Sequence, residues 1–265
     1  MLRGFVLCTA RLHLIPTMST HFQPAALKFL TSLARNNDRE WFAARKPIYE
    51  KELKTPLLAL IEEINHAMVD FAPDHLRPAH KAMMRIYRDT RFAKDKRPYK
   101  HQVAAWWARH GMEKVSGGGF YFHVHPKELH ISAGVYMPER EQLLAIRRWM
   151  AEHHEEYRAL LKPLLKPRGK AVPFTLLDPN ALTRMPKGFP NDHPADELLR
   201  AKNWGVQVAL PAELATSPKL AKEIIARFRA TTTLVHTLNG AILAGERAVR
   251  PQANDDERKP RRPLF

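Results

Sequence analysis

The sequence predicts an α+β fold in which helices pack on a small, mostly antiparallel sheet. Three observations predict this fold: helical spacing of apolar residues near the start, two β-rich runs around a short turn, and one long amphipathic segment near the end. The chain has 265 residues, 45% of them hydrophobic and 26% charged, so it can bury a core without help. We expect a single domain over residues 22–245.

The first part of the chain, about residues 25–69, is predicted to be helical in several pieces, and we call it the helical opening. Residues 25–34 form the first helix. Asn37, followed three residues later by Glu40, has the spacing of an N-cap with a capping box and predicts the start of a second helix. Pro47 and Pro56 should break that helix, and its last piece runs to about residue 69. The side chains expected to face the core are Phe29, Leu30, Leu33, Leu57, Leu60, Ile61, Ile64 and Met68.

Extended segments follow from Met83. The runs 121–125 and 130–136 are rich in β-forming residues, and the four residues between them predict a hairpin turn. Pro138 marks the start of a helix, and residues 204–210 form another strand. A final long helix follows Ser217. Its expected buried positions are Leu220, Ile224, Phe228, Leu234, Leu238 and Ile242.

The two ends differ from this central part. In residues 1–21 two arginines flank a short apolar stretch, and no convincing signal-peptide cleavage site follows it. We therefore expect a disordered segment or a gene-model extension, with Met18 as an alternative start to Met1. Residues 246–265 combine proline with mixed charges, which predicts a disordered basic tail. The single cysteine, Cys8, allows no internal disulfide, and no apolar run approaches the roughly 18 residues that cross a bilayer. We therefore expect a cytoplasmic protein with no membrane partner.

Charge is the strongest global signal. Lysine and arginine number 43 against 27 acidic residues, which leaves a net charge of +16. A net positive charge of this size attracts polyanions but does not identify which polyanion is bound. Residues 81–100 hold eight cations and two acids, so more than a third of the net charge lies in twenty residues. The expected partner is an anionic ligand, such as a nucleotide or nucleic acid; the sequence identifies no cofactor and leaves the oligomeric state open.

The predicted site is the segment from residue 85 to residue 100. Arginine binds phosphate or carboxylate through paired hydrogen bonds, whereas lysine supplies a mobile charge. If residues 85–89 form a strand, their cations point to both faces, and two aromatic residues, Phe92 and Tyr99, are expected to anchor the loop that follows. The predicted ligand-binding residues are Arg39, Arg85, Arg88, Arg91, Lys96, Tyr99 and Lys100.

The two acids of this segment have alternative roles. Asp89 or Asp95 either orients an arginine or serves as a catalytic base. The alternative is that both acids pair with neighbouring arginines while the other charges face water.

Two functions fit the segment. One is an enzyme with phosphoester or phosphodiester chemistry, in which arginines clamp the anion, Lys96 and Lys100 steady developing charge, and Asp89 or Asp95 is the base. The other is a non-catalytic module that binds nucleic acid or another polyanion with the same cations, Tyr99 and the tryptophans. The chain lacks the glycine fingerprint of dinucleotide-binding enzymes, the His-Glu-x-x-His motif and the Gly-x-Ser-x-Gly motif, which disfavours common dehydrogenases, metalloproteases and lipases.

Three histidines are a weaker candidate, for zinc. His123 and His125 are two residues apart in a predicted strand and share a face, and a four-residue turn would bring His130 opposite His125. The sequence places no carboxylate nearby, and surface histidines in hairpins are common. No metal ligand is therefore predicted.

Four strings carry a resemblance to a known family: FLTSLARNNDREWFAARKPIYE, RIYRDTRFAKDKRPYK, YFHVHPKELHISAGVYMPE and PKGFPNDHPADELLRAK. Together they resemble the bacterial and fungal family called domain of unknown function 2461, over about residues 22–210. The resemblance implies no particular activity. The chain departs from the family pattern at Ala93, where a serine is usual, and at His101, where a small polar residue is expected. Matching positions are Asn37, Arg39, Glu40, Trp41, Arg85, Arg88, Asp89, Arg91, Phe92, Lys94, Asp95, Lys96, Pro98, Tyr99 and Lys100.

Overall fold

A five-stranded antiparallel sheet lies at the centre of the protein. The computed structural model describes residues 20–112 and 117–249, and it confirms the α+β prediction. The order of the strands in the sheet is β1-β2-β3-β5-β4, and every neighbouring pair is antiparallel. Their bounds are β1 Val103–Ala108, β2 Gly119–His125, β3 Glu128–Val135, β4 Thr175–Leu176 and β5 Trp204–Pro211.

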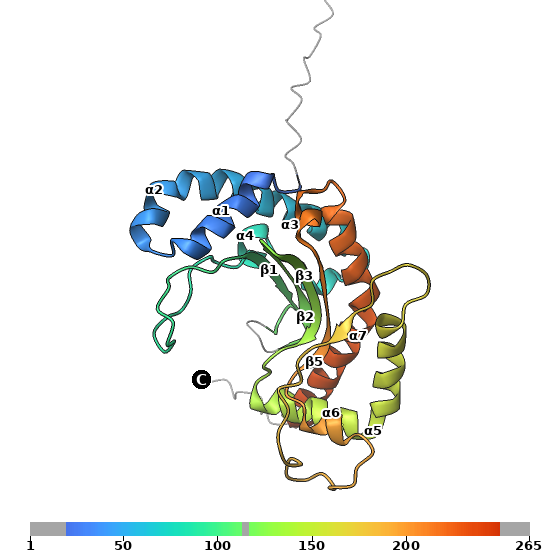
Figure 1. Cartoon of the computed structure of the whole chain (residues 1–265). Helices are drawn as coiled ribbons and strands as arrows, with labels where there is room; N and C mark the ends of the chain where they lie inside the picture. The colour runs from blue at the N-terminus through green and yellow to red at the C-terminus, as the bar shows by residue number, and fades with distance from the viewer. Residues whose placement is uncertain (1–19, 113–116, 250–265) are drawn as a thin grey trace, which may run out of the picture.

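Helices cover one face and one end of the sheet. In Figure 1 the long helix α7 runs along one face with α5 beside it, the helical opening lies across one end, and the other face is turned toward the segment between α4 and β1. The helices are α1 Pro24–Arg35, α2 Arg39–Tyr49, α3 Thr55–Met68, α4 Ala79–Ala82, α5 Arg140–Leu165, α6 Asp196–Arg200 and α7 Leu220–Val249, with shorter turns η1 Glu50–Lys54, η2 Pro73–His75 and η3 Ala212–Thr216.

The core lies between the helices and one face of the sheet. All the side chains predicted to face the core in the opening and in the last helix are buried. On β2, Phe120, Phe122 and Val124 point into this core, whereas the alternate residues Tyr121 and His123 are only half-buried. The sheet therefore has one apolar face under α7 and one partly polar face away from it.

The helical opening comes in pieces, as predicted, and its last piece ends at Met68, but of the two prolines only Pro56 lies at a boundary between pieces. Pro47 lies inside α2, and Pro56 lies in the first turn of α3. Between them η1 is a π-helical turn, in which the amide of Thr55 reaches the carbonyl of Glu50, five residues back. This wider turn lies directly before Pro56, which lacks an amide hydrogen to donate, and it joins α2 to α3.

The start of the segment between α4 and β1 pairs with β1. Met83 forms an isolated antiparallel bridge with Ala105, and the amide of Met84 donates to the carbonyl of Ala104 at 2.8 Å. The chain therefore runs along the side of β1 that β2 does not occupy.

Two predictions fall on the ends of the chain. The N-terminal extension, up to residue 19, and the tail from residue 250 lie outside the described residues, while α7 extends to Val249, just past the predicted domain boundary. Among the described residues, none of the helices combines the length and the apolar character needed to span a membrane.

Candidate functional site

The polar face of the sheet carries two hollows. The first, which we call the basic cleft, has a volume of about 530 Å³, and the second, which we call the sheet pocket, has a volume of about 550 Å³. The basic cleft is lined by Arg88, Asp89, Asp95, Arg97, Tyr99, Lys100, His101, Gln102 and His125. The sheet pocket is lined by Met84, Trp106, Tyr121, His123, His130, Ser132, Ala133, Gly134, Tyr136, Leu177 and Gln207.

The basic loop, residues 85–100, closes on itself like a hairpin. The amide of Arg88 donates to the carbonyl of Pro98, and the amide of Lys100 donates to the carbonyl of Ile86, each at 2.8 Å. Tyr87 and Tyr99 form an isolated bridge. Residues 85–89 are not a strand of the sheet, so the expected alternation of cations between two sheet faces does not arise.

Tyr99 anchors the loop to the helical opening. Its side chain is only 4% exposed and stacks on Phe42, with ring centroids 4.2 Å apart. The amide of Tyr99 donates to Asn37 Oδ1, and Asn37 Nδ2 donates to the carbonyl of Tyr99, each at 3.0 Å. The predicted second anchor is wrong, since Phe92 is 95% exposed.

Asn37 is therefore not an N-cap. The neighbouring Asp38 caps α2, and its carboxylate accepts a hydrogen bond from the amide of Trp41 at 2.8 Å. The side-chain amide of Asn37 is instead free to pair with the backbone of Tyr99 and to contact His101 Nε2 at 2.8 Å. The Asn37 side chain thus connects the helical opening to the basic loop.

Asp95 holds two arginines of the basic loop together. Its Oδ2 accepts from Arg88 Nη1 at 2.8 Å and from Arg97 Nη2 at 2.7 Å, and its Oδ1 accepts from the amide of Arg97. These hydrogen bonds, chiefly those from Arg97, lower the pKa of the Asp95 carboxyl. Asp95 is therefore ionised at neutral pH and positions both guanidinium groups.

Asp89 has a similar arrangement with Arg91. The carboxylate accepts from Arg91 Nη2 at 2.7 Å and from Arg91 Nε at 3.1 Å, and these bonds lower the pKa of Asp89 to about 2. Lys96 Nζ donates to the carbonyl of Thr90 at 3.0 Å. A carboxylate with so low a pKa is a weak proton acceptor, so the geometry supports the orienting role for Asp89 more than the role of base.

The structure brings only some of the predicted ligand-binding residues together. Arg88, Tyr99 and Lys100 line the basic cleft, and Arg97, which was not among the predicted ligand-binding residues, joins them. The other predicted residues are exposed and do not line it: Arg39, Arg85, Arg91 and Lys96. Lys100 is half-buried, and burial, with a smaller effect of Arg85, lowers the pKa of its ammonium group.

The sheet pocket is largely apolar, with a polar wall on β2 and β3. Tyr121 connects it to the basic cleft: its hydroxyl oxygen accepts from Gln102 Nε2 at 3.1 Å and lies 3.1 Å from His123 Nδ1. Burial raises the pKa of Tyr121 to about 12. Trp106 lines this pocket while Trp107 is buried on the opposite face, where its indole donates to Asn65, so the two tryptophans do not form one stacking surface.

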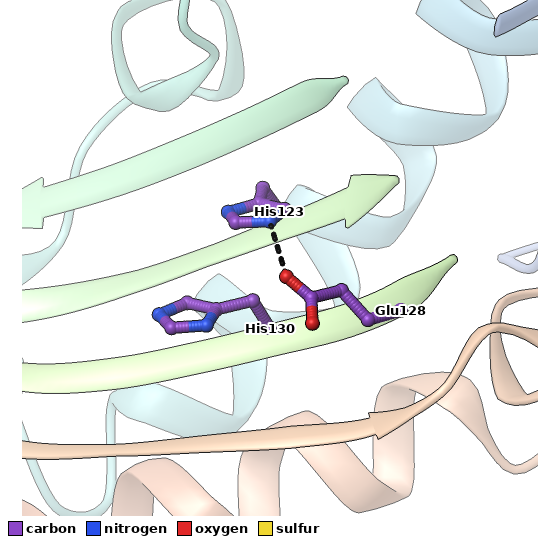
Figure 2. A group of neighbouring side chains, drawn as sticks. All are labelled: His123, Glu128 and His130. Carbon is purple, nitrogen blue, oxygen red and sulfur yellow. Dashed lines mark ion pairs between the residues drawn. The ribbon is translucent and has the colours of Figure 1, made fainter. Parts of the chain in front are cut away.

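The hairpin formed by β2 and β3 has a shorter turn than the sequence predicted. Two residues, not four, separate β2 from β3, so His123 pairs directly with His130 and His125 pairs with Glu128. The His123 and His130 rings stack with centroids 4.8 Å apart and planes 7° from parallel. Figure 2 shows the carboxylate of Glu128 reaching toward the two imidazoles, with Oε1 at 3.6 Å from His123 Nε2.

These histidines are neutral at neutral pH. Burial, with smaller effects of His130 and His125, lowers the pKa of His123 to about 3, and burial also lowers the pKa of His130. His125 lies at the turn, where its Nδ1 accepts from the amide of Lys127 at 3.3 Å. The contact between His123 and Glu128 is therefore not a salt bridge at neutral pH.

Comparison with known families assigns the chain to one of them. Residues 25–236 match the model of the family described as "Conserved hypothetical protein (DUF2461)". The chain belongs to this family. The match confirms the resemblance and extends beyond residue 210 into α7, and it covers both hollows of this DUF2461 protein. No curated protein and no solved structure matches the chain.

Proposed function

We propose that this DUF2461 protein binds a small phosphate-bearing or other anionic ligand in the basic cleft. Lys100 is the observation that carries the proposal. It is half-buried in the wall of the cleft, and no carboxylate of the described residues forms an ion pair with it. A partly desolvated charge without a partner costs free energy, which a bound anion would recover.

The rest of the cleft supports the same ligand class. Arg88 and Arg97 line it and are held in place by Asp95, so their donors need little ordering when a ligand binds. His101 and Gln102 add neutral polar groups. We propose binding as the primary function and phosphoester or phosphodiester hydrolysis as a secondary activity of the same cleft. Binding comes first because the low pKa of Asp89 argues against that residue as a base.

Binding of nucleic acid or another polyanion is the second candidate, and the exposure of Phe92 favours it. The ring is 95% exposed, and the guanidinium of Arg91 lies 5.9 Å from its centroid. An exposed aromatic ring beside cations suits stacking against unpaired bases. This mode would use the tip of the basic loop rather than the cleft.

Calorimetric titration with inorganic pyrophosphate tests the first candidate. Lys100→Gln should weaken binding about 10- to 100-fold, the value of one charge-assisted hydrogen bond. Lys94→Gln is the matched control, because it removes the same charge from an exposed position outside the cleft and should change affinity less than about twofold. Equal effects of the two substitutions, or no binding by the wild-type protein, would contradict a built anion site.

Titration with a single-stranded oligonucleotide at several salt concentrations tests the second candidate. Phe92→Ser should weaken oligonucleotide binding about 5- to 100-fold, as expected for one lost stacking contact, and leave pyrophosphate binding unchanged. Lys94→Gln should reduce the slope of affinity against salt. A panel of phosphoesters and phosphodiesters, measured on the same variants, then tests for turnover.

We also propose a cytoplasmic location. The single cysteine, Cys8, supports it, because the fold needs no internal disulfide and loses nothing in a reducing compartment. Fractionation of cells that express the native gene tests this location directly.

A further inference from the structure

A cluster of side chains beside the sheet pocket is not used by the anion proposal. His123, Glu128 and His130 project from β2 and β3 onto the same face of the sheet, and one ligand atom from each lies within 4.8 Å of the others (Figure 2). We propose that these three side chains bind a zinc ion, or a divalent ion of similar preference, with at least one coordination position open to the sheet pocket.

The donor set selects the class of metal. Two imidazoles and one carboxylate form the three-ligand set found in catalytic zinc sites, in which water or substrate takes the fourth position. Imidazole nitrogen suits zinc, copper, nickel and iron, whereas magnesium and calcium prefer oxygen ligands only. One carboxylate beside two imidazoles therefore favours a transition metal over magnesium or calcium.

The hairpin holds the ligands near the required geometry. β2 lies between β1 and β3, and β3 lies between β2 and β5, so neither strand is at an edge of the sheet and the pairing of His123 with His130 is fixed on both sides. Zinc bonds of about 2.1 Å at tetrahedral angles place ligand atoms about 3.4 Å apart. The three ligand atoms can approach from the present separation by rotation of the side chains, without a change in strand register.

The surroundings favour the metal-binding form of the histidines. A metal on His123 Nε2 requires the proton on Nδ1, and the hydroxyl oxygen of Tyr121 lies 3.1 Å from that nitrogen, ready to accept the hydrogen bond. Gln102 donates to the same oxygen and fixes its position.

The sheet pocket supplies access to the ion. His123 and His130 both line this hollow of about 550 Å³, which has room for water and for a small organic ligand. None of the three proposed ligands lines the basic cleft. The metal site is thus separate from the anion site, and either can be present without the other.

Zinc titration of the untagged full chain, after dialysis against a chelator, tests the proposal. The wild-type protein should bind one equivalent of zinc and, with cobalt(II), give the visible absorption of a tetrahedral site, which zinc then abolishes. Magnesium and calcium should not compete. Tyr121→Phe should weaken zinc binding about 10- to 100-fold, the cost of losing an outer-shell partner.

Substitution of the ligands should cost more than substitution of Tyr121. His130→Gln and Glu128→Gln should each weaken zinc binding more than about 100-fold, whereas the control His80→Gln, at an exposed position of α4, should leave it unchanged. Thermal unfolding of each apoprotein checks that the variants fold, and zinc should raise the melting temperature of the wild type and of His80→Gln more than that of the two ligand variants. Pyrophosphate binding by His130→Gln should match that of the wild type, which separates this proposal from the anion site.

Three results would overturn the proposal: no zinc bound by the wild type, equal affinity in the wild type and both ligand variants, or a cobalt spectrum no different from that of the ion in buffer. Each would leave His123 and His130 as a stacked pair that packs on the sheet without an ion.

Discussion

Replacement of Asn37 by alanine should loosen the basic loop while leaving the rest of the fold intact. The substitution removes two hydrogen bonds between the Asn37 side chain and the backbone of Tyr99, each 3.0 Å long. A net value of about 0.5–1.5 kcal/mol for each bond gives a loss of about 1–3 kcal/mol for loop closure. At about 1.4 kcal/mol per tenfold, the open form of the loop should become about 5- to 150-fold more populated.

Hydrogen exchange of the backbone amides measures this opening. The amides of Arg88, Tyr99 and Lys100 are bonded within the loop or to Asn37, so their protection should fall by that factor in Asn37→Ala, while amides of β3 should keep theirs. Asn36→Ala is the matched control, because Asn36 is exposed and its side chain donates to the carbonyl of Ser32 within α1 rather than to the basic loop. Unchanged exchange over residues 86–100 in Asn37→Ala would refute the role assigned to this side chain.

Three further predictions concern stability. His75 is fully buried, and this burial lowers its pKa to about 4. The hydrogen bond to Gly118 and the charge of Asp74 raise the pKa, whereas His236 and Arg109 lower it, and all four effects are smaller than that of burial. Because the unfolded state then binds more protons than the folded state, the free energy of unfolding should fall by about 3 kcal/mol as the pH falls from 6.5 to 4. Denaturant titrations of His75→Gln should lack this component. An equal dependence of the unfolding free energy on pH in the wild type and the variant would contradict the prediction. Gly134→Ala should destabilise the fold by about 2–5 kcal/mol, because φ is +139° and a Cβ there would lie 2.2 Å from the carbonyl oxygen of Trp204. Gly240→Ala, where a Cβ meets nothing within 4 Å in α7, should instead stabilise it by about 0.5–1 kcal/mol in the same melts; destabilisation by both to the same extent would refute the steric argument.

The helices and the core could be predicted because apolar periodicity is a local signal that tertiary packing then uses. Phe228 and Leu238 of α7, for example, recur at helical spacing and lie fully buried against the sheet. Pro47 misled because a proline removes one α-helical hydrogen bond without ending the helix, which here continues into a π-helical turn before Pro56. Nothing in the sequence between them signals that wider turn.

The candidate site could be located but not assembled from the sequence. Asp38 and Asn37 are both good N-cap residues, and only the position of Tyr99, 62 residues later, determines which of them caps the helix. Likewise Phe92 and Tyr99 are both aromatic residues of one loop, and burial depends on which of them reaches Phe42. Contacts between residues that lie so far apart in the sequence cannot be predicted from local sequence patterns.

The histidine cluster shows how one turn decides which residues meet. A four-residue turn would have placed Glu128 outside the strands, whereas the two-residue turn makes it the first residue of β3, on the same face as His130. Two-residue hairpin loops usually contain Asn-Gly, Asp-Gly or a leading glycine. Pro126 and Lys127 do not match that pattern, so the local sequence does not signal the shorter turn.

The two residues that lead into the basic loop, Met83 and Met84, have a structural role that follows from their path along β1. A strand at the border of a sheet offers unpaired amides and carbonyls to any other extended chain, which is a common route to aggregation. Met83 and Met84 occupy these groups at Ala105 and Ala104, and the charge of Arg85 follows at once. Excision of residues 83–100 to abolish ligand binding would therefore also expose the edge of β1, so the chemistry of the basic loop is better tested one side chain at a time.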